Sequence, residues 1–278
     1  MEIFPNAHAE KVAYQEHWRN NAAFFQEQGC YDWMAGQLAA IRPKKVLDLG
    51  CGTGEGIIAL RKAFSCQVIG IDENESCLTQ ATERLKASNE YVSLAIRFEY
   101  KHTSNGLHFI RMKKSPIEAS SVITLVQGDP LLDDPGLVAF LSSQSPFDAM
   151  IVWLIGSYNF RQSCASLSPL RISTPGDYRL RVQNRCYELA GRFLRSGGLL
   201  QVVDRGEEFT SEALMRDHLD GHKDQASVTD LEVLEVQSRP YVEHTRGKGV
   251  AMVTTLGASG RVPKLDKLFM HSVLSRKP

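Results

Sequence analysis

The sequence predicts a doubly wound α/β fold, with a mostly parallel seven-stranded sheet and helices on both of its faces. Three observations favour this fold class. Short apolar segments such as 44–50, 67–72 and 147–153 alternate with segments of helical periodicity. A glycine-rich turn follows the first apolar segment. Acidic residues stand at the ends of later ones, where ligands bind on sheets of this kind.

The expected strands are short apolar runs bounded by polar or glycine-rich turns. They cover 44–50, 67–72, 121–127, 147–153 and 199–204, with further candidates at 231–236, 250–255 and 269–274. The helices between them are expected at 55–64, 76–86, 132–142, 177–194 and 210–219. Two earlier helices are expected at 8–28 and 31–41, and Arg42-Pro43 ends the second of them. We therefore divide the chain into an N-terminal helical cap, 1–43, and a Rossmann-like domain, 44–278.

Residues 92–121 depart from the strand–helix rhythm. Two strand-like segments, from Leu94 to Tyr100 and from Leu107 to Met112, flank Asn105-Gly106. An Asn-Gly pair between such segments is a strong hairpin signal. We interpret 92–121 as a β-hairpin insertion before the next strand of the sheet.

The composition of the chain indicates which partners and which cellular location to expect for the protein. The chain has 278 residues, and its 32 Lys and Arg balance its 32 Asp and Glu, which gives no broad attraction to nucleic acid or to an anionic membrane. No stretch approaches the ~20 apolar residues of a membrane span, and the N-terminus has no signal-peptide pattern. The six cysteines form no C-x-x-C pair, so we expect reduced, mostly buried thiols and no metal site. The expected location is cytoplasmic.

The glycine-rich turn carries the strongest functional signal. Its glycines let the backbone turn sharply, and the helix after it offers free N–H groups to an anionic ligand. The spacing is G-x-G-x-G, whereas dinucleotide-binding proteins use G-x-G-x-x-G. With an acid two residues before the first glycine, the segment DLGCGTG resembles the first motif of the class I S-adenosylmethionine-dependent methyltransferases. The cofactor contacts that this resemblance implies are Asp48, Gly50, Cys51, Gly52, Thr53 and Gly54. A ligand-free glycine turn and a dinucleotide site are the alternatives.

Asp72 is the second candidate, because it ends a strand 22 residues after Gly50. A carboxylate placed there can accept hydrogen bonds from both ribose hydroxyls. The alternative is that Asp72 caps the next helix, although Asn74 and Ser76 can also do so. The resemblance implies that Glu73 flanks the adenine.

The third and fourth strand ends add weaker candidates. The resemblance places Gly128, Asp129 and Pro130 at the cofactor, with Asp129 receiving the adenine amino group. An Asp before proline is also a common turn residue. Trp153 ends the following strand, where it either lines the cavity or packs in the core. The resemblance covers about residues 44–205, including the L-x-x-G-G-x-L entry to the strand at 199–204.

The resemblance implies S-adenosylmethionine as cofactor, S-adenosylhomocysteine as product and a methyltransferase activity. Methyl transfer is an in-line displacement that depends on positioning and exclusion of water, and it needs a general base only when the acceptor must lose a proton. No catalytic residue therefore follows from the motifs. Acceptor-side candidates stand in three places: Tyr14, His17, Trp18 and Arg19 in the first helix; Tyr158, Asn159 and Arg161 after the fourth strand; and Asp204-Arg205.

The acceptor class is inferred from absent motifs. The segment 153–156 lacks the Pro-Pro-aromatic motif of amino-directed nucleobase enzymes, and the chain has no Pro-Cys nucleophile. We expect a small-molecule acceptor with an O, N or S atom, and no nucleic-acid partner. The alternatives are a protein methyltransferase, a non-catalytic partner subunit that binds an adenosyl ligand, and an enzyme with other chemistry on the same fold, such as an oxidoreductase. The sequence does not predict the oligomeric state.

Overall fold

The computed structural model describes residues 7–103, 106–111, 117–119, 121–156, 164–243 and 268–278. The strands are β1 (Lys45–Leu49), β2 (Gln67–Asp72), β3 (Val92–Ala95), β4 (Phe98–Thr103), β5 (Gly106–Arg111), β6 (Ile123–Gln127), β7 (Phe147–Trp153), β8 (Leu194–Glu207), β9 (Glu232–Tyr241) and β10 (Leu268–Arg276). The helices are α1 (Ala7–Glu27), α2 (Cys30–Gly36), α3 (Glu55–Phe64), α4 (Glu75–Ala87), α5 (Pro135–Gln144), α7 (Pro175–Phe193) and α8 (Glu212–Ala226), with a 3-10 helix η1 (Ala165–Leu170).

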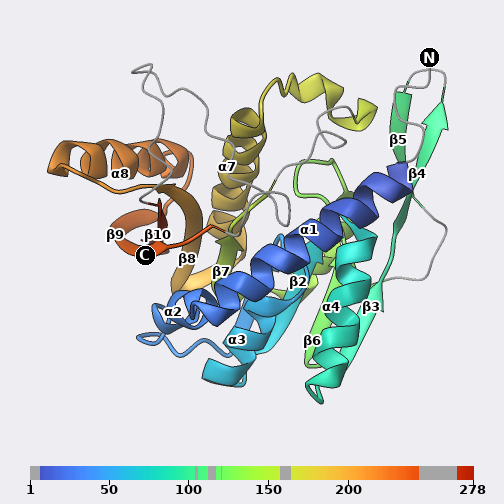
Figure 1. Cartoon of the computed structure of the whole chain (residues 1–278), viewed down its shortest axis with the longest axis horizontal. Coiled ribbons are helices and arrows are strands. Elements are labelled where there is room, and N and C mark those ends of the chain that lie inside the picture. The colour runs from blue at the N-terminus through green and yellow to red at the C-terminus, as the bar shows by residue number, and fades with distance from the viewer. Residues whose placement is uncertain (1–6, 104–105, 112–116, 120, 157–163, 244–267) are drawn as a thin grey trace.

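The main sheet confirms the predicted fold class. Its strands lie in the order β3-β6-β2-β1-β7-β8-β10-β9 (Figure 1). β1 lies at the centre, parallel to β2 and β7. β10 pairs antiparallel with both β8 and β9, and the other pairs of described strands in this sheet are parallel. The described part of the sheet has eight strands rather than the predicted seven. The predicted strand at 250–255 lies outside the described residues.

The additional strand comes from the segment interpreted as the start of the hairpin. Val92–Ala95 pairs in parallel with β6 at the edge of the main sheet, and the hairpin itself begins only at Phe98. The break is fixed by Gln127, whose side-chain oxygen accepts the backbone N–H groups of Arg97 and Phe98 at 2.9 and 2.8 Å. β4 and β5 then pair as the predicted antiparallel hairpin (Figure 1).

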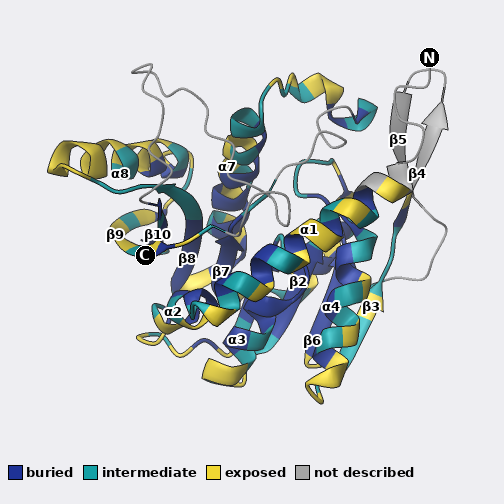
Figure 2. Cartoon of the chain, viewed as in Figure 1, coloured by how far each residue is buried: buried dark blue, intermediate teal, exposed yellow. Residues whose placement is uncertain are grey.

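Helices cover both faces of the sheet because successive strand residues point to opposite sides. Val46 and Val68 belong to a core cluster shared with α1, α2, α3 and α4, whereas Leu47 and Ile69 belong to one shared with α5, α7 and α8. Figure 2 shows the central strands buried between helices whose outer surfaces are exposed. The predicted cap helices α1 and α2 thus contribute to the same core as the sheet.

The six cysteines are buried, as their scattered positions in the sequence predict. None of them forms a disulfide bond. None of the helices in the described ranges has both the length and the apolar character that crossing a membrane requires.

A buried ion pair joins the start of the hairpin to the body of the domain. Arg97 donates to both carboxylate oxygens of Asp134, at 2.5 and 3.0 Å, and the two side chains are 11% and 3% exposed. Asp134 also caps α5 by accepting the backbone N–H of Leu137. The pair therefore fixes the position of the insertion relative to β6 and α5.

We predict that Arg97→Ala lowers the free energy of unfolding by about 3 kcal/mol or more, because it removes a buried charged partner that donates two hydrogen bonds to the Asp134 carboxylate. Urea unfolding followed by circular dichroism measures the change. The matched control is Arg185→Ala, which removes an exposed pair with Glu188 and is expected to cost less than about 1 kcal/mol. Equal losses in the two variants would contradict the structural role of the Arg97 pair.

Candidate functional site

The loops after β1, β2, β6 and β7 meet at one edge of the sheet, as parallel strands require, and line a first cavity. Of the predicted cofactor contacts, the residues that line this cavity are Gly50, Gly52, Asp72, Glu73, Gly128, Asp129 and Pro130. The remaining ones, Asp48, Cys51, Thr53, Gly54 and Trp153, lie outside its lining. The structure thus brings together residues from three strand ends that lie up to 80 positions apart in the chain.

The glycine loop adopts the backbone conformation that its sequence predicts. Gly50, Gly52 and Gly54 have φ angles of 84°, 50° and 90°, in the left-handed region that favours glycine. Gly54 is also the residue at which α3 begins. The backbone N–H groups of Gly50 and Cys51 donate to the carbonyl oxygen of Ile71 at 2.8 and 3.0 Å, so the turn is anchored to the end of β2.

Asp72 supports the loop from the neighbouring strand. One carboxylate oxygen accepts the N–H of Gly52 and the other accepts the N–H of Asn74, both at 2.9 Å. Asn74, not Asp72, caps α4, by accepting the N–H of Ser76 at 3.0 Å. Burial and the adjacent Glu73 carboxylate raise the pKa of Asp72 well above its usual range. The ribose contact of Asp72 stays a prediction.

The loop after β6 carries Asp129, which is almost fully buried. Its carboxylate accepts the backbone N–H of Leu131 at 2.9 Å, so it stabilises a turn at the edge of the cavity. Asp129 therefore stabilises a turn, as one of the two sequence interpretations predicts, and it also lines the cavity. Contact of Asp129 with adenine stays a prediction.

Two of the candidates outside the lining are buried beside Gly56, in the first turn of α3. Asp48 is 3% exposed, and burial raises the pKa of its carboxyl to about 7. Trp153 packs in the core, where its indole N–H donates to the side-chain oxygen of Gln201 at 3.1 Å. Of the two roles considered for Trp153, lining the cavity or packing, the structure shows packing.

The other two side-chain candidates also point into the protein. The hydroxyl of Thr53 donates to Glu55 at 2.7 Å, and both side chains are buried at the start of α3. The Cys51 thiol lies 3.0 Å from the position that a Cβ on Gly70 would occupy, so it packs against β2. Their contribution to the site is the shape of the turn.

The N-terminal helix covers the cavity. Of the predicted acceptor-side residues in α1, Tyr14 and Trp18 line the cavity, whereas His17 and Arg19 are exposed. The indole nitrogen of Trp18 lies 2.7 Å from the position that a Cβ on Gly52 would occupy, and Tyr14 lies as closely beside Gly156. Glycine at these two positions therefore gives room to the aromatic side chains.

Other lining residues lacked a sequence signal. Leu154, Ile155 and Gly156 follow β7 directly, so the strand-end rule indicates their region but not their direction. Tyr178 and Val182 come from α7, and Cys77 from α4. The way a helix packs against the sheet decides which of its turns faces the cavity. The apolar periodicity of the helix does not predict this packing. Tyr158, Asn159 and Arg161 lie outside the described residues.

The cavity is narrow in this closed arrangement. Its volume is about 50 Å³, below the roughly 300 Å³ or more of pockets that hold a cofactor-sized molecule. Trp18 and Ile155 fill the space beside Gly52 and Gly50, where a ligand would approach the backbone. The glycine cradle fits an adenosyl ligand once these side chains move aside.

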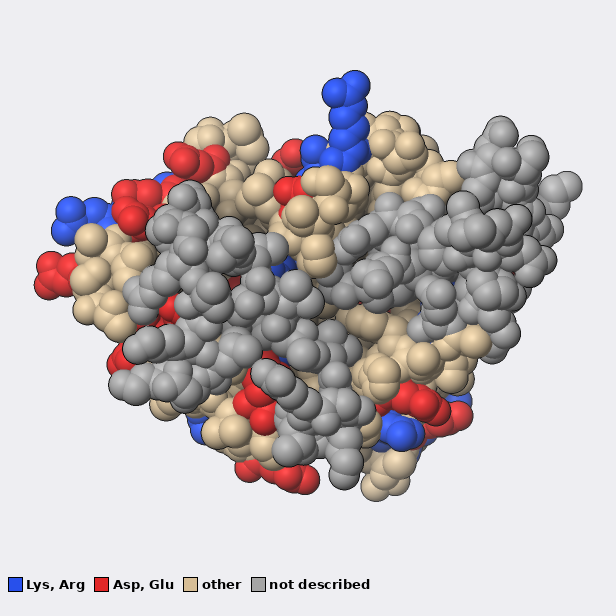
Figure 3. All heavy atoms as spheres, turned by 45° about the horizontal axis from the view of Figure 1, so that its top comes forward, with Lys and Arg blue, Asp and Glu red and all other residues tan. Residues whose placement is uncertain are grey.

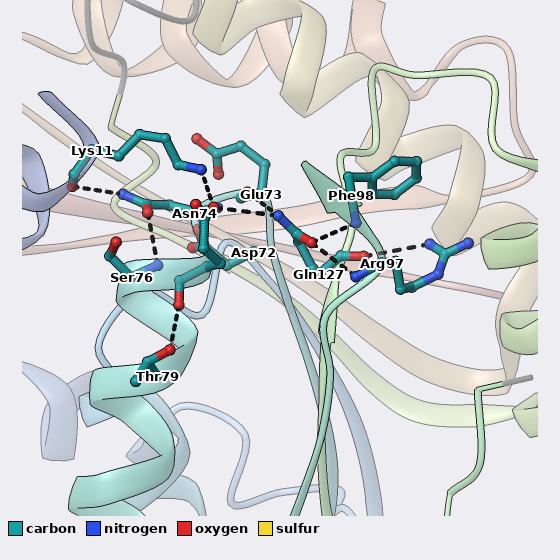
Figure 4. A network of polar contacts seen from close by, with 10 residues as sticks. Lys11, Asp72, Glu73, Asn74, Ser76, Thr79, Arg97, Phe98 and Gln127 are labelled. Carbon is teal, nitrogen blue, oxygen red and sulfur yellow. Dashed lines mark hydrogen bonds and ion pairs between the residues drawn. The ribbon is translucent and has the colours of Figure 1, made fainter. Parts of the chain in front are cut away.

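A buried polar network holds α1 in this position (Figure 4). The Lys11 ammonium is 1% exposed and forms an ion pair with Glu75, and burial lowers its pKa. The side-chain amide of Asn74 donates to the carbonyl oxygen of Lys11 at 3.1 Å, and Gln127 donates to Glu75 at 3.3 Å. One network thus connects α1, the end of β2, α4 and β6 next to the cavity.

A family comparison identifies this part of the chain. Residues 46–109, from β1 into β5, match the family model described as methyltransferase domain. This segment is similar to that family. The resemblance to the class I S-adenosylmethionine-dependent methyltransferases is thereby confirmed, with the subfamily unassigned. The match includes the glycine loop and Asp72 and ends before the loop that carries Asp129.

Similar proteins are distant from this chain. An uncharacterized protein of Haemophilus influenzae is 33% identical over 57 residues, which are 20% of this chain and 23% of that protein. The chain thus matches about a quarter of the length of this curated relative.

One similar solved structure is that of the N-methyltransferase NodS from Bradyrhizobium japonicum in complex with S-adenosylhomocysteine. It is 12% identical to this chain, the match covers 98% of this chain and 99% of NodS, and the TM-score is 0.48. The O-methyltransferase TomG from Streptomyces achromogenes, in complex with S-adenosylmethionine, has 12% identity, covers 97% of this chain and 90% of its own, and has a TM-score of 0.41. Likenesses at this level do not assign a ligand or a substrate to this chain.

We predict that the methyltransferase domain loses stability as the pH rises from about 4 to 8 because of Asp48. Its pKa is raised from 3.8 to about 7 in the folded state, so folding favours the protonated form and its contribution is lost as the pH rises through 7. The loss reaches about 4 kcal/mol. Asp48→Asn abolishes this contribution, so the variant gains stability relative to the native protein as the pH rises. Urea unfolding at pH 4.5, 6 and 8 measures the difference.

The control for Asp48→Asn is Asp220→Asn, an exposed carboxylate on α8. Its stability should follow that of the native protein at all three pH values. A constant difference between Asp48→Asn and the native protein would contradict a raised pKa at Asp48.

Proposed function

We propose that the chain transfers a methyl group from S-adenosylmethionine to a small molecule. The observation that carries this proposal is the glycine loop of a methyltransferase domain, anchored by Asp72 at the end of β2 and open toward a cavity. The N-terminus of α3, directly after the loop, and a carboxylate one strand away are suited to a ligand with both a carboxylate and a ribose.

We assign each part of the first cavity a proposed contact with the cofactor. The backbone of Gly50 and Gly52 would lie against the methionine portion, Asp72 would accept the ribose hydroxyls, and Asp129 would receive the adenine amino group. When bound, the cofactor supplies a methyl group on a positively charged sulfur. The protein's own contribution is positioning and exclusion of water.

Exclusion of water is supported by the arrangement of α1. Trp18 lies against Gly52 of the glycine loop and Tyr14 lies beside Gly156, and the Lys11–Glu75 ion pair holds the helix in place. A helix attached in this way can close over a bound cofactor. The sulfonium is then shielded from solvent while the acceptor approaches from the β7 and β8 side.

The small-molecule acceptor is supported by charge and by the size of the neighbouring space. On the face drawn in Figure 3, the acidic and basic side chains of the described residues are interspersed. A second cavity of about 450 Å³ lies at the end of β8, within the range of small-molecule sites. A protein side chain is the alternative acceptor, and a non-catalytic partner subunit is the alternative role.

Calorimetric titration tests the cofactor. We expect S-adenosylmethionine and S-adenosylhomocysteine to bind and NADH not to bind. Folded protein that binds neither adenosyl ligand would overturn the proposal. Tight binding without turnover across pools of small molecules and peptides would favour the partner-subunit role.

We predict that Asp72→Ala weakens binding of S-adenosylhomocysteine by roughly 1–3 kcal/mol, about 5- to 150-fold, the size of a lost hydrogen bond to a charged group. The variant also loses the bond to Gly52 that anchors the loop. Asp72→Asn, which keeps an acceptor for one backbone N–H, separates the two contributions. Asp133→Ala, an exposed carboxylate nearby in the chain, is the control and should bind normally. Unchanged affinity in Asp72→Ala would show that Asp72 only anchors the loop.

A further inference from the structure

The second cavity lies between α7, α8 and the end of β8 (Figure 1). Asp204 and Glu207 line it from β8, Arg179 from α7, His218 from α8 and His271 from β10. Its volume of about 450 Å³ is much larger than that of the cavity at the glycine loop. It is therefore a space into which a molecule can enter without displacing side chains.

The two cavities adjoin one another. The N–H of Leu154, which lines the first cavity, donates to the carbonyl oxygen of Val203 at 2.8 Å, and the next residue, Asp204, lines the second. Neighbouring strands lie only about 4.8 Å apart. Along α7, Val182 lines the first cavity and Gln183 the second. The linings of the two cavities therefore meet at two places, between β7 and β8 and along α7.

One wall of the second cavity consists of aromatic rings without charge. His271 has its Nε2 2.7 Å from the carbonyl oxygen of Glu207, so this nitrogen carries the hydrogen, and its Nδ1 accepts from the hydroxyl of Ser238 at 2.8 Å. Burial lowers its pKa, so the ring is neutral. Phe209 stacks on His271 with 4.0 Å between ring centroids.

A second imidazole, on α8, extends this wall. The ring of His218 lies 5.2 Å from that of Phe209. Burial, followed by the neighbouring imidazoles of His222 and His271, lowers the pKa of His218 to about 4. His218 is therefore neutral at pH 7. No three His, Cys, Asp or Glu side chains among the described residues are arranged to bind a metal ion, so this wall is a surface for an organic group.

The charged lining residues favour a cation. Three carboxylates, those of Asp204, Glu207 and Glu208, line the cavity together with Arg179 and Arg205. Arg205 is paired with Glu243 at 2.9 Å, and Glu208 has an interaction partner of its own. The carboxylates of Asp204 and Glu207 therefore give two negative charges against the one positive charge of Arg179. Because the imidazoles are neutral, they do not offset this excess. The cavity thus offers an aromatic surface beside an anionic one.

The entrance adds apolar surface. Leu180 on α7 and Leu214 on α8 line the cavity and are 49% and 42% exposed. Exposed leucines beside a cavity give an apolar group a surface to bury. The features of the site therefore fit a molecule with an apolar or aromatic body and a positively charged head.

We propose that the second cavity binds a primary or secondary amine carried on an apolar body, with Asp204 facing the ammonium. Resting on the proposed function, this amine is the methyl acceptor. The ammonium gives one proton to Asp204 and on to solvent, and its nitrogen lone pair then forms the N–C bond to the methyl group. The C–S bond breaks with its electron pair returning to sulfur, which yields the methylated amine, protonated at nitrogen, and S-adenosylhomocysteine.

The test compares three probes with the same body and different heads: phenethylamine, 2-phenylethanol and phenylacetate. Each is titrated into the full chain saturated with S-adenosylhomocysteine. We expect phenethylamine to bind at least tenfold more tightly than phenylacetate. Equal affinity of the amine and the acid, or no binding of any probe at millimolar concentration, would overturn the proposal. The titration with S-adenosylhomocysteine itself reports separately on the proposed function.

Substitutions of the lining carboxylates test whether the amine binds in the second cavity. Asp204→Asn should weaken phenethylamine binding about tenfold and leave S-adenosylhomocysteine binding unchanged, whereas Asp217→Asn, an exposed acid on α8, should change neither. Because Asp204 also accepts a hydrogen bond from Gln183, the partly exposed Glu207→Gln is a second variant that spares this contact and should weaken binding severalfold. Unchanged amine affinity in both variants would place the amine elsewhere.

Methyl transfer tests the acceptor role. With S-adenosylmethionine, we expect mass spectrometry to detect N-methylphenethylamine, and Asp204→Asn to lower its rate of formation. An amine that binds in the second cavity of cofactor-loaded protein without becoming methylated, across a panel of primary and secondary amines, would overturn the assignment of this molecule as the acceptor.

Discussion

The architecture of the site depends on one constraint, the attachment of the glycine loop to the end of β2. Gly50 and Cys51 donate to the Ile71 carbonyl oxygen, and Asp72 accepts the N–H of Gly52. These bonds hold the loop in a conformation with three positive φ angles, which residues other than glycine rarely adopt. The loop therefore presents bare backbone to whatever lies above it. Every other part of the first cavity is arranged around that surface.

The space beside the glycines is filled by side chains in this structure, and a bound ligand would fill the same space. Trp18 and Ile155 occupy it in this structure, and the network of Lys11, Glu75 and Gln127 holds α1 above it. A buried ion pair with several hydrogen bonds is costly to separate but specific in its geometry. Such a network suits a helix that must return to one position after a cofactor has entered or left.

The two cavities differ in size and in the chemical groups that line them. The first is enclosed and contains the glycine backbone and Asp72, whereas the second is larger, lies at the end of β8 and combines neutral imidazoles with carboxylates. A parallel sheet explains why they adjoin, because consecutive strands deliver their carboxyl ends to one edge. The part of the chain that matches the methyltransferase family supplies the lining residues of the first cavity between Leu49 and Cys77 and none of those of the second. The second cavity is therefore built by later elements of the chain.

The sequence by itself determined the fold class, the strand–helix order through β8 and the hairpin, because apolar periodicity and glycine turns are local properties. It also determined the strand ends at which Gly50, Asp72 and Asp129 lie. Only the tertiary structure decided that β3 joins the sheet, that Asp48 and Trp153 are buried outside the first cavity, and that α7 and α8 line a second cavity. These outcomes depend on how helices dock and where side chains point across the sheet, which no local pattern encodes.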